Sequence, residues 1–573
     1  MPAGERVEDG PSDIATRGRR RWPAFVLAAV AALAGALLAP EPWPAGGAQL
    51  EILRGDEVVA VAPVEVGDSE PRTIDVSQPT LDGRIELPDG LPVDAPITIT
   101  VDADAATDAD PLTLRLVLSD GRTELIPIVD RGEDGSTVEA TRRPPNGSIA
   151  VLALLGAVVV LWVSEVVPLF VTSLAIPVVL VATRVGSPDD ALAPFFHPII
   201  ALFFGGFLMA EAMRRTGLDH LAAISIIARA GRSPRTLFAA MIGVSAFLSM
   251  WMSNTAAAAV MLPIALAVTA PMDSPGYRRA LVLGIAYAAT VGGVGSAIGT
   301  PANPLAIAFL DDFVGRDVSF VEWFAIGLPM VVLFLPIMGA YLWWRMGASP
   351  DGARFGEVRR IARAGLVEAG RPNRDQLVVI AVFLGVIALW LSETWHGLET
   401  GIVALAGAIV LALLGKVTQE DLGRISWASL LTFGGGLALG LFLLESGTSD
   451  WIAVQLGGLA AVPAPIAVAA VAAVTLGLTT VASNTASAAM IIPLVIPLSA
   501  IIGVDATLLV MVVAIASSID FALVIGTPPT LLAYSTRLFT TGQIFRIGIV
   551  LDLIGLLLLV TVITWLWGLL GVT

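Results

Sequence analysis

"MWMSNTAAAAVMLP" spans residues 250–263 and "TVASNTASAAMIIP" spans residues 480–493, so the same Ser-Asn-Thr triplet occurs twice inside apolar sequence. Three adjacent hydrogen-bonding side chains are costly in hydrocarbon unless they have partners. The triplets therefore predict a site that binds a polar or charged ligand. For a single triplet, the alternative is a polar cluster that packs two helices against each other.

The sequence around the triplets is that of a membrane protein. Of its 573 residues, 56% are hydrophobic and only 14% are charged, and the mean hydropathy is +0.82. Apolar runs recur that are long enough to cross a hydrocarbon core roughly 30 Å thick. This composition excludes an ordinary soluble protein and predicts an all-α polytopic membrane protein. The chain has no cysteine, and its histidines (His197, His220 and His396) lack metal-ligand spacing.

Eleven membrane spans are predicted. The first covers residues 23–40, and the others lie near 149–165, 167–185, 198–214, 278–310, 321–345, 376–392, 399–415, 428–446, 505–535 and 545–570. Two more segments, 234–269 and 464–501, hold the triplets at their middles and are predicted to be re-entrant hairpins that enter and leave on one face. This assignment gathers the arginine-rich loops on the cytoplasmic face. It places the N-terminus in the cytoplasm, the C-terminus outside, and the protein in the plasma membrane.

The chain is predicted to divide into six segments. They are a cytoplasmic tail (1–22), the first transmembrane helix (23–40), an acidic β-rich extracytoplasmic domain (41–147), a first transport repeat (148–345), a cytoplasmic linker (346–375) and a second transport repeat (376–573). The alternative for the first apolar run is a cleaved signal peptide, because Arg17–Arg21 precede it and small residues follow it.

Residues 41–147 differ in composition from the rest of the chain. They hold 22 acidic and 8 basic residues, which accounts for a charge of −14 out of the total of −16. Stretches such as "TIDVSQP" (73–79) and "LTLRLVLSD" (112–120) alternate apolar and polar residues between turn signals. This alternation predicts short strands in a small β-domain inserted after the first helix.

The two halves of the membrane region match at a fixed offset. Gly217 and Gly447, the triplet serines Ser253 and Ser483, and Pro263 and Pro493 are each 230 residues apart. A second break follows each triplet, "GSAIGTPANP" (295–304) and "VIGTPPT" (524–530), where proline removes backbone donors and interrupts the helix. Because one hairpin would enter from each side, the halves predict inverted repeats with broken helices, which is typical of a secondary transporter.

The residue types at these breaks indicate the ligands. Unwound carbonyls together with Ser, Thr and Asn oxygens form a neutral cage that suits Na⁺. Helix N-termini at the hairpin tips suit a carboxylate or sulfate. Neither motif contains Lys or Arg, so co-bound cations would have to neutralise a divalent anion.

The paired triplets, the paired Gly-Thr-Pro breaks and "LWVSEVVPLFVTSLAIP" (161–177) resemble the divalent anion–sodium symporter family. The resemblance runs from about Leu152 to the C-terminus. It implies a homodimer in the lipid bilayer, with a scaffold domain, a transport domain that moves as an elevator, and two Na⁺ sites. Of the family's substrates, a C4-dicarboxylate is expected, with sulfate or another oxyanion as the alternative.

The resemblance also implies roles for individual residues. The first Na⁺ site would use Ser249, Ser253, Asn254 and Gly299, and the second Thr479, Ala482, Asn484 and Gly526. The anion would contact Asn254, Thr255, Asn484 and Thr485, with Thr300, Pro301, Thr527 and Pro528 close by. Where the family has Thr-Pro-Pro-Asn in both breaks, this chain has Thr-Pro-Ala-Asn and Thr-Pro-Pro-Thr, so Thr530 removes an amide near the site.

Asp520 is a carboxylate inside a predicted span. It is expected on the helix that leads to the second break, seven residues before Thr527 and on the same face. Such a group indicates function by default, and Asp520 is predicted to strengthen the second cation site without contacting the ion, or to make coupling there sensitive to pH. The alternative is a structural carboxyl that hydrogen-bonds Ser517 or Ser518.

Other classes of function stay open. Proton coupling or anion exchange would depend on Asp520, and a sensor would use the β-domain to bind its ligand. No GxSxG or HExxH motif occurs, so an enzyme is not predicted, and neither is a nucleic-acid partner.

Overall fold

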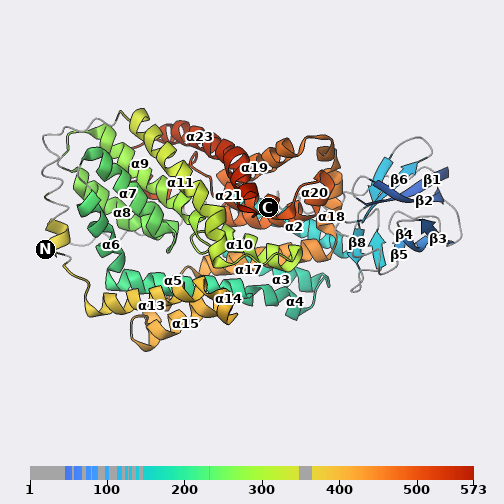
Figure 1. The fold of residues 1–573 in the computed structure, drawn as a ribbon, viewed down its shortest axis with the longest axis horizontal. Helices are drawn as coiled ribbons and strands as arrows, with labels where there is room; N and C mark the ends of the chain where they lie inside the picture. Colours follow the sequence, from blue (N-terminus) through green and yellow to red (C-terminus); the bar gives the residue numbers. More distant parts are fainter. Residues whose placement is uncertain are drawn as a thin grey trace, which may run out of the picture. The chain divides into compact units, whose positions relative to one another are not determined.

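The computed structural model describes the backbone of nine strands between residues 46 and 140, and the chain over residues 146–572 apart from 231–232, 271, 348–359, 361–363 and 369. The predicted cytoplasmic tail and first transmembrane helix lie outside the described residues. The described chain divides into two compact units (Figure 1). One holds the strands, the chain up to Ala191 and Ala438–Gln455, and the other holds Leu192–Leu437 and Leu456–Thr573.

The strands form two antiparallel sheets, with the orders β2-β1-β6-β7 and β3-β4-β5-β9-β8. Their bounds are β1 (Gly46–Arg54), β2 (Glu57–Val66), β3 (Arg72–Gln78), β4 (Leu81–Leu87), β5 (Ile97–Val101), β6 (Leu112–Leu118), β7 (Thr123–Ile126), β8 (Ile128–Arg131) and β9 (Thr137–Ala140). Strand β1 is central in its sheet, with Leu50 opposite Ala62 on β2 and Leu116 on β6. That the strands form an extracytoplasmic domain stays a prediction.

Three helices accompany the strands in the first unit: α2 (Asn146–Ser164), α3 (Leu169–Ala182) and α18 (Thr448–Gln455). Helix α18 packs against α2 and β8, and α2 packs against α3. The turn between α2 and α3 has Glu165 at a positive φ of 46° and ends at Pro168, which precedes the first residue of α3.

The second unit begins with short helical turns and the helices that carry the first triplet. Their bounds are α4 (Pro188–Leu192), η1 (Ala193–Phe196), α5 (Pro198–Thr216), α6 (Leu218–Ala230), α7 (Pro234–Ser249), α8 (Asn254–Thr269), α9 (Pro275–Gly292), η2 (Gly293–Gly295), α10 (Ala302–Phe309), η3 (Leu310–Val314) and α11 (Phe320–Arg345). Gly217 ends α5 with a φ of +69°, a conformation that favours glycine. Ser233 and Thr236 form a capping box that starts α7.

The later part of the chain has a similar order of elements. Their bounds are α13 (Arg374–Leu391), α14 (Glu393–His396), α15 (Thr400–Leu413), α16 (Gln419–Leu422), α17 (Trp427–Glu445), η4 (Gly457–Ala461), α19 (Ala464–Val481), α20 (Asn484–Ile502), α21 (Ala506–Ala516), α22 (Pro528–Ser535), α23 (Thr541–Leu558), η5 (Leu559–Ile563) and α24 (Thr564–Leu570). Capping boxes at Asn373 and Thr540 start α13 and α23.

Seven helices in the described part of the chain are long and apolar enough to cross a membrane. They are Pro188–Thr216, Phe320–Arg345, Arg374–Leu391, Trp427–Glu445, Ala464–Val481, Asn484–Ile502 and Thr541–Leu570. Shorter apolar helices accompany them, including α7 and α8 around the first triplet. The chain is thus a polytopic membrane protein. The count of 11 spans and the re-entrant course of the two hairpins stay predictions.

Two predicted spans are interrupted where the sequence has its Gly-Thr-Pro motifs. Residues 278–310 hold α9 and α10, and residues 505–535 hold α21 and α22. Helix α21 ends at Ala516, and residues 517–527 contain no helix. The expectation that Asp520 lies on a helix is therefore wrong. The short helices α6 and α18 had not been predicted, because they are brief and carry charged residues.

Helices α9 and α21 form the centre of the second unit. Every residue of α9 from Ala280 to Gly292 is buried, as is α21 from Leu509 to Ala516. A helix that is apolar all round must be covered on all sides. Helix α9 packs against α7, α8, α11 and α22, and α21 packs against α19, α20 and α10. Each break helix thus packs on elements of the other half, since α10 contacts α20 and α21 while α22 contacts α8 and α9.

Candidate functional site

Both triplets start a helix, and in both the serine is the N-cap. The Ser253 hydroxyl accepts a hydrogen bond from the N–H of Ala256 at 3.3 Å, and the Ser483 hydroxyl accepts one from Ala486 at 3.2 Å. Serine caps a helix well because its oxygen satisfies one of the free N–H groups of the first turn. The remaining N–H groups at the starts of α8 and α20 give each tip a partial positive charge.

An oxygen cluster lies beside the first triplet. The Ser249 hydroxyl is 2.6 Å from the carbonyl oxygen of Ala289 and 2.7 Å from the side-chain amide of Asn254. The same end of that amide is 3.1 Å from the carbonyl oxygen of Gly299 and 3.2 Å from that of Ala289. Ser249 has one hydroxyl proton and cannot donate to both Ala289 and Asn254.

The orientation of the Asn254 amide decides what this cluster holds. With its nitrogen toward the cluster, the amide donates to the oxygens of Ser249, Gly299 and Ala289. With its oxygen toward the cluster, four oxygens face one another and need a cation among them. Nitrogen and oxygen of an amide occupy nearly the same positions, so the same residues can form either arrangement. The residues present therefore fit Na⁺, which prefers neutral oxygen ligands.

The second triplet has the same arrangement. The Thr479 hydroxyl is 2.6 Å from the carbonyl oxygen of Ser517 and 3.0 Å from Oδ1 of Asn484. Thr479 thus corresponds to Ser249 and Asn484 to Asn254, in positions 230 residues apart. Two hydroxyl–asparagine pairs therefore lie at two helix starts in one unit.

Side chains brace the first break. The Asn303 amide donates to the carbonyl oxygens of Gly293 at 2.9 Å, Val294 at 3.4 Å and Ser296 at 2.7 Å. Trp323 donates its indole N–H to Val294 as well, at 3.1 Å. The Ser296 hydroxyl donates to the carbonyl oxygen of Met250, which joins the break to the hairpin tip. These bonds replace the helical bonds that the break removes.

The second break is braced differently. Tyr287 of α9 donates its hydroxyl to the carbonyl oxygen of Phe521 at 2.8 Å, and Asp552 of α23 accepts the N–H of Phe521 at 2.9 Å. These two bonds use the backbone groups that would otherwise continue α21, which explains why Asp520 is not helical. Thr530, in the position of Asn303, makes only a 2.9 Å bond to Thr527.

The predicted residues divide into two groups by exposure. Asn254, Asn484 and Thr485 are half-buried and Thr255 is exposed, so the helix starts remain accessible. Thr300 and Thr527 are buried, and Thr527 also lies 3.5 Å from the Thr290 hydroxyl. Of the other predicted sodium ligands, Gly299 has its carbonyl oxygen beside the first cluster, Ala482 ends α19 two residues before Asn484, and Gly526 lies against the Asp520 carboxylate.

Reasoning from the sequence missed Asn303, Trp323, Tyr287 and Asp552. The first two complete the geometry of the first break, and the last two that of the second. Only the family's expected Thr-Pro-Pro-Asn pattern pointed to Asn303. The structure shows that its amide binds backbone, so the loss of that amide at Thr530 removes a brace.

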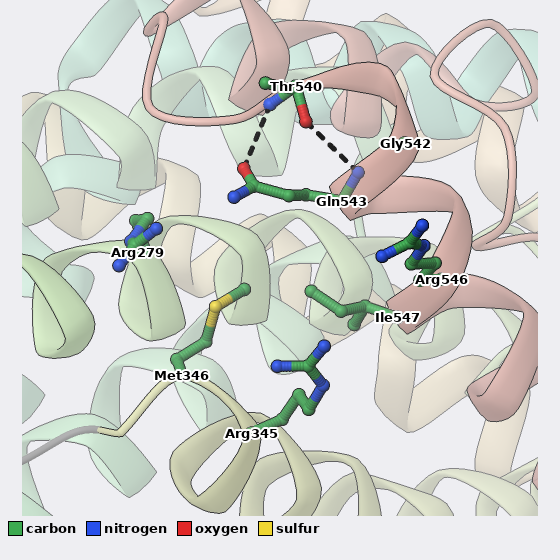
Figure 2. A pocket seen from close by; sticks show the side chains of 8 residues that line it. All are labelled: Arg279, Arg345, Met346, Thr540, Gly542, Gln543, Arg546 and Ile547. Atoms are coloured by element: carbon green, nitrogen blue, oxygen red, sulfur yellow. Dashed lines mark hydrogen bonds between the residues drawn. The ribbon is translucent and has the colours of Figure 1, made fainter.

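A separate cavity of about 410 Å³ lies where α9, α11 and α23 meet (Figure 2). Arg279, Arg345 and Arg546 reach it from these three helices, and Thr540 and Gln543 form the cap of α23 at its edge. No acidic residue lines it within the described part of the chain. Three guanidinium groups without a carboxylate create a field that attracts anions.

Ion pairs outside the triplets are structural. Glu211 near the end of α5 pairs with Arg214 and Arg424, and Arg215 donates to Asp421 at 2.6 Å. Although burial acts to raise it, hydrogen bonds from Thr418 and Arg215 bring the pKa of Asp421 below its usual range. Over the described residues, no group of three or more His, Asp or Glu could hold a metal ion.

The chain is similar in sequence to known membrane transporters. A family model described as citrate transporter matches residues 159–506, with a second match over 387–570. The chain is 31% identical over 446 residues to the sodium-dependent dicarboxylate transporter SdcS of Staphylococcus saprophyticus, which covers 73% of this chain and 86% of that protein. The protein of the same name from Staphylococcus aureus is 31% identical over 450 residues, again with 73% and 86% covered. Among solved structures, the YdaH transporter of Alcanivorax borkumensis matches 66% of this chain and 86% of its own, with 15% identity and a TM-score of 0.46.

Proposed function

The chain belongs to the divalent anion–sodium symporter family, whose members are transporters and not enzymes, and from this membership we propose that it carries a small dicarboxylate together with Na⁺. The observation that carries the proposal is the pair of hydroxyl–asparagine clusters at two helix starts. The curated relatives, named as sodium-dependent dicarboxylate transporters, support both the ion and the class of anion.

The anion would bind between the two hairpin tips. N–H groups at the starts of α8 and α20 supply donors, and the side chains of Asn254, Thr255, Asn484 and Thr485 add amide and hydroxyl groups. A C4-dicarboxylate has a carboxylate at each end, and each tip offers one anion-binding helix start. The two tips therefore suit the two ends of one dianion.

Two sodium ions would bind beside the anion. The first would lie among Ser249, Asn254 and the carbonyl oxygen of Gly299, with Ser253 next to it, and the second among Thr479, Asn484 and the backbone of Ala482 and Gly526. Each ion supplies a positive charge that the polar tips lack. Cation and dianion thus stabilise each other, so that a gradient of one drives transport of the other.

Transport would follow the elevator pattern of inverted-repeat carriers, with import into the cell by a homodimer in the plasma membrane. The division into residues 148–345 and 376–573 as two repeats belongs to this proposal. The cross-packing of α10 on α20 and α21, and of α22 on α8 and α9, supports it, because the two breaks and the two tips then move as one body. Residues 41–147 would lie outside the cytoplasm and take no part in the chemistry.

Flux into liposomes tests the proposal. Purified protein is reconstituted, and uptake of labelled succinate is measured with an inward Na⁺ gradient, with a K⁺ gradient of the same size, and with a proton gradient alone. Sodium-dependent uptake is expected, with competition by unlabelled dicarboxylate exceeding that by sulfate. Uptake driven equally well by protons would overturn sodium coupling, while preferential competition by sulfate would replace the dicarboxylate with an oxyanion.

A further inference from the structure

The two halves differ in charge at a position beside the clusters. Counted back from the glycine of each Gly-Thr-Pro, the sixth residue is Gly293 before Gly299 and Asp520 before Gly526. The same position thus holds no side chain in the first half and a carboxylate in the second. The contacts of the two residues show what surrounds this position in each half.

In the first half, this position faces the oxygen cluster. A Cβ atom built on Gly293 would lie 2.5 Å from Oδ1 of Asn254 and 2.9 Å from the carbonyl oxygen of Gly299. Both atoms belong to the proposed first sodium site. A side chain at this position therefore points at the place where the cation would bind, and glycine leaves that space to the amide.

In the second half, the Asp520 carboxylate occupies the corresponding place. A Cβ atom on Gly526, the counterpart of Gly299, would clash with that carboxylate, with Oδ1 at 2.7 Å. The carboxylate therefore lies directly against the backbone that the second sodium site would use. Its correspondence with Gly293, which faces Asn254, is the reason to expect it near Asn484 in the proposed site.

Nothing in the described protein satisfies this carboxylate. Asp520 is 0% exposed, and neither of its oxygens has a hydrogen-bond partner among the described residues. The predicted alternative, a bond to Ser517 or Ser518, is not formed, because Ser517 donates to Ala514 and the Ser518 hydroxyl has no partner in this region either. The groups that act electrostatically here are Asp552, whose Oδ1 binds Phe521, and Tyr287, whose hydroxyl donates to Phe521.

A buried carboxylate without donors, next to a second carboxylate and with no Lys or Arg, stays charged only if a cation binds to it and otherwise takes up a proton. We propose that Asp520 is a direct oxygen ligand of the second sodium site, so that this chain combines one neutral and one anionic cation site. This inference rests on the proposed function and deepens it. The carboxylate adds a fixed negative charge where the first half has only dipoles.

The charge changes the order in which the ligands bind. At the neutral first site, Na⁺ depends on the dianion for its counter-charge. At the second site Asp520 supplies that charge, so Na⁺ binds there before the anion arrives. The protein is therefore expected to bind sodium measurably in the absence of any dicarboxylate.

The test measures sodium binding without transport. The unfolding temperature of purified protein is followed while NaCl replaces choline chloride at constant ionic strength, in the absence of dicarboxylate. The wild-type chain is expected to gain stability with a saturating dependence on Na⁺. Asp520→Asn keeps the shape and removes the charge. It should raise the half-saturating Na⁺ concentration at least about tenfold, since one contact between opposite charges in a protein exceeds the ~1.4 kcal/mol that a tenfold change represents.

The change in unfolding temperature without Na⁺ distinguishes a ligand of the ion from a structural residue. Without Na⁺, Asp520→Asn should unfold at the same or a higher temperature than the wild type, because it removes a buried carboxylate that has no hydrogen-bond partner among the described residues. Asp421→Asn is the control, since it also removes a buried carboxylate, but one that pairs with Arg215 away from the triplets and breaks. That variant should unfold at a lower temperature while its half-saturating Na⁺ concentration stays within about twofold of wild type.

Three results would overturn the inference. An Asp520→Asn variant with wild-type sodium dependence, or one that is destabilised to the same extent at every Na⁺ concentration, would make Asp520 structural and leave the proposed function standing. A wild-type protein that Na⁺ does not stabilise, and that transports dicarboxylate without Na⁺, would remove sodium coupling altogether and the inference with it.

Discussion

Asn254 and Asn484 each follow a serine that caps a helix. The amide of each lies next to the hydroxyl group of the residue five positions earlier in the chain. Their distances to Ser249 and Thr479 are 2.7 Å and 3.0 Å. In the proposed function, each of these asparagines would bind the anion through its amide N–H group and the cation through its amide oxygen. Replacing either one would therefore remove ligands of both kinds.

Asn254→Ala and Asn484→Ala should each reduce sodium-driven succinate uptake by at least about tenfold, because removal of one partner leaves buried polar groups unsatisfied. Liposome flux is the measurement. Ser499→Ala is the control, since Ser499 is buried in α20 but bonds only Ile496 of its own helix. Unchanged flux in either asparagine variant would remove that residue from the site.

Asn303 is expected to matter for stability more than Thr530 does. Asn303→Ala removes an amide that binds three carbonyl oxygens, whereas Thr530→Ala removes one hydroxyl contact. Val294 keeps the indole N–H of Trp323 and Ser296 keeps the N–H of Gly299, but the carbonyl of Gly293 loses its side-chain donor. Leaving a buried carbonyl unpaired costs about 1–3 kcal/mol. Thermal unfolding in detergent should show the larger drop for Asn303→Ala, and equal drops would contradict its role as a brace.

At the scale of elements, the architecture depends on close approach of backbones around the breaks. A Cβ atom on Gly292 of α9 would overlap the backbone of Ala246 in α7, and one on Gly548 of α23 would overlap the backbone of Phe521. Only glycine permits this approach. Helix α23 can therefore lie against the second break, where Asp552 reaches Phe521.

Gly548→Ala should destabilise the protein by about 1–3 kcal/mol, because the added methyl group has no space and must displace the break. Gly243→Ala is its control, since nothing lies within 4 Å of the added atom and Gly243 is inside α7. In a helix interior that change is expected to be neutral or stabilising by up to about 1 kcal/mol. Thermal unfolding of both variants checks the pair, and a stable Gly548→Ala protein would contradict the close packing.

At the scale of the whole molecule, charge and hydrophobicity are segregated. Residues 41–147 carry a charge of −14, and the rest of the chain carries −2. The family match begins only at residue 159. The triplets and breaks, and the helices that position them, all lie in the second unit. The β-rich segment therefore contributes none of the residues assigned to the site.

Replacing residues 49–145 with a short Gly/Ser linker should leave sodium-dependent binding of succinate within about threefold of the full chain, a change smaller than ~1 kcal/mol. Some loss of thermal stability is expected, because β8 packs against α18. Isothermal titration of the two proteins measures the difference. Loss of binding in a folded deletion variant would show that the segment helps to form the site.

The positions of the triplets and breaks followed from local chemistry. Serine caps a helix through its own first turn, and proline interrupts one wherever it occurs. The resemblance of the chain to its family rested on the same motifs and is confirmed, as are the membrane character and the interruptions in residues 278–310 and 505–535. Such features involve residues a few positions apart, so they are present in the sequence whatever the rest of the chain does.

The conformation around Asp520 was decided by tertiary structure. The sequence around it continues an apolar helix, yet the backbone of Phe521 bonds to side chains instead. Tyr287, 234 residues away, donates to the carbonyl oxygen of Phe521, and Asp552 accepts its N–H. The brace formed by Asn303 likewise depends on a chain that has already turned back on itself. Local propensity sets where a helix is able to start or stop, but a buried backbone group bonds whichever partner the packed helices bring to it. For that reason the sequence by itself determined the kind of protein and the places of its site, while the packing of α9 and α23 on the second break decided where the carboxylate lies.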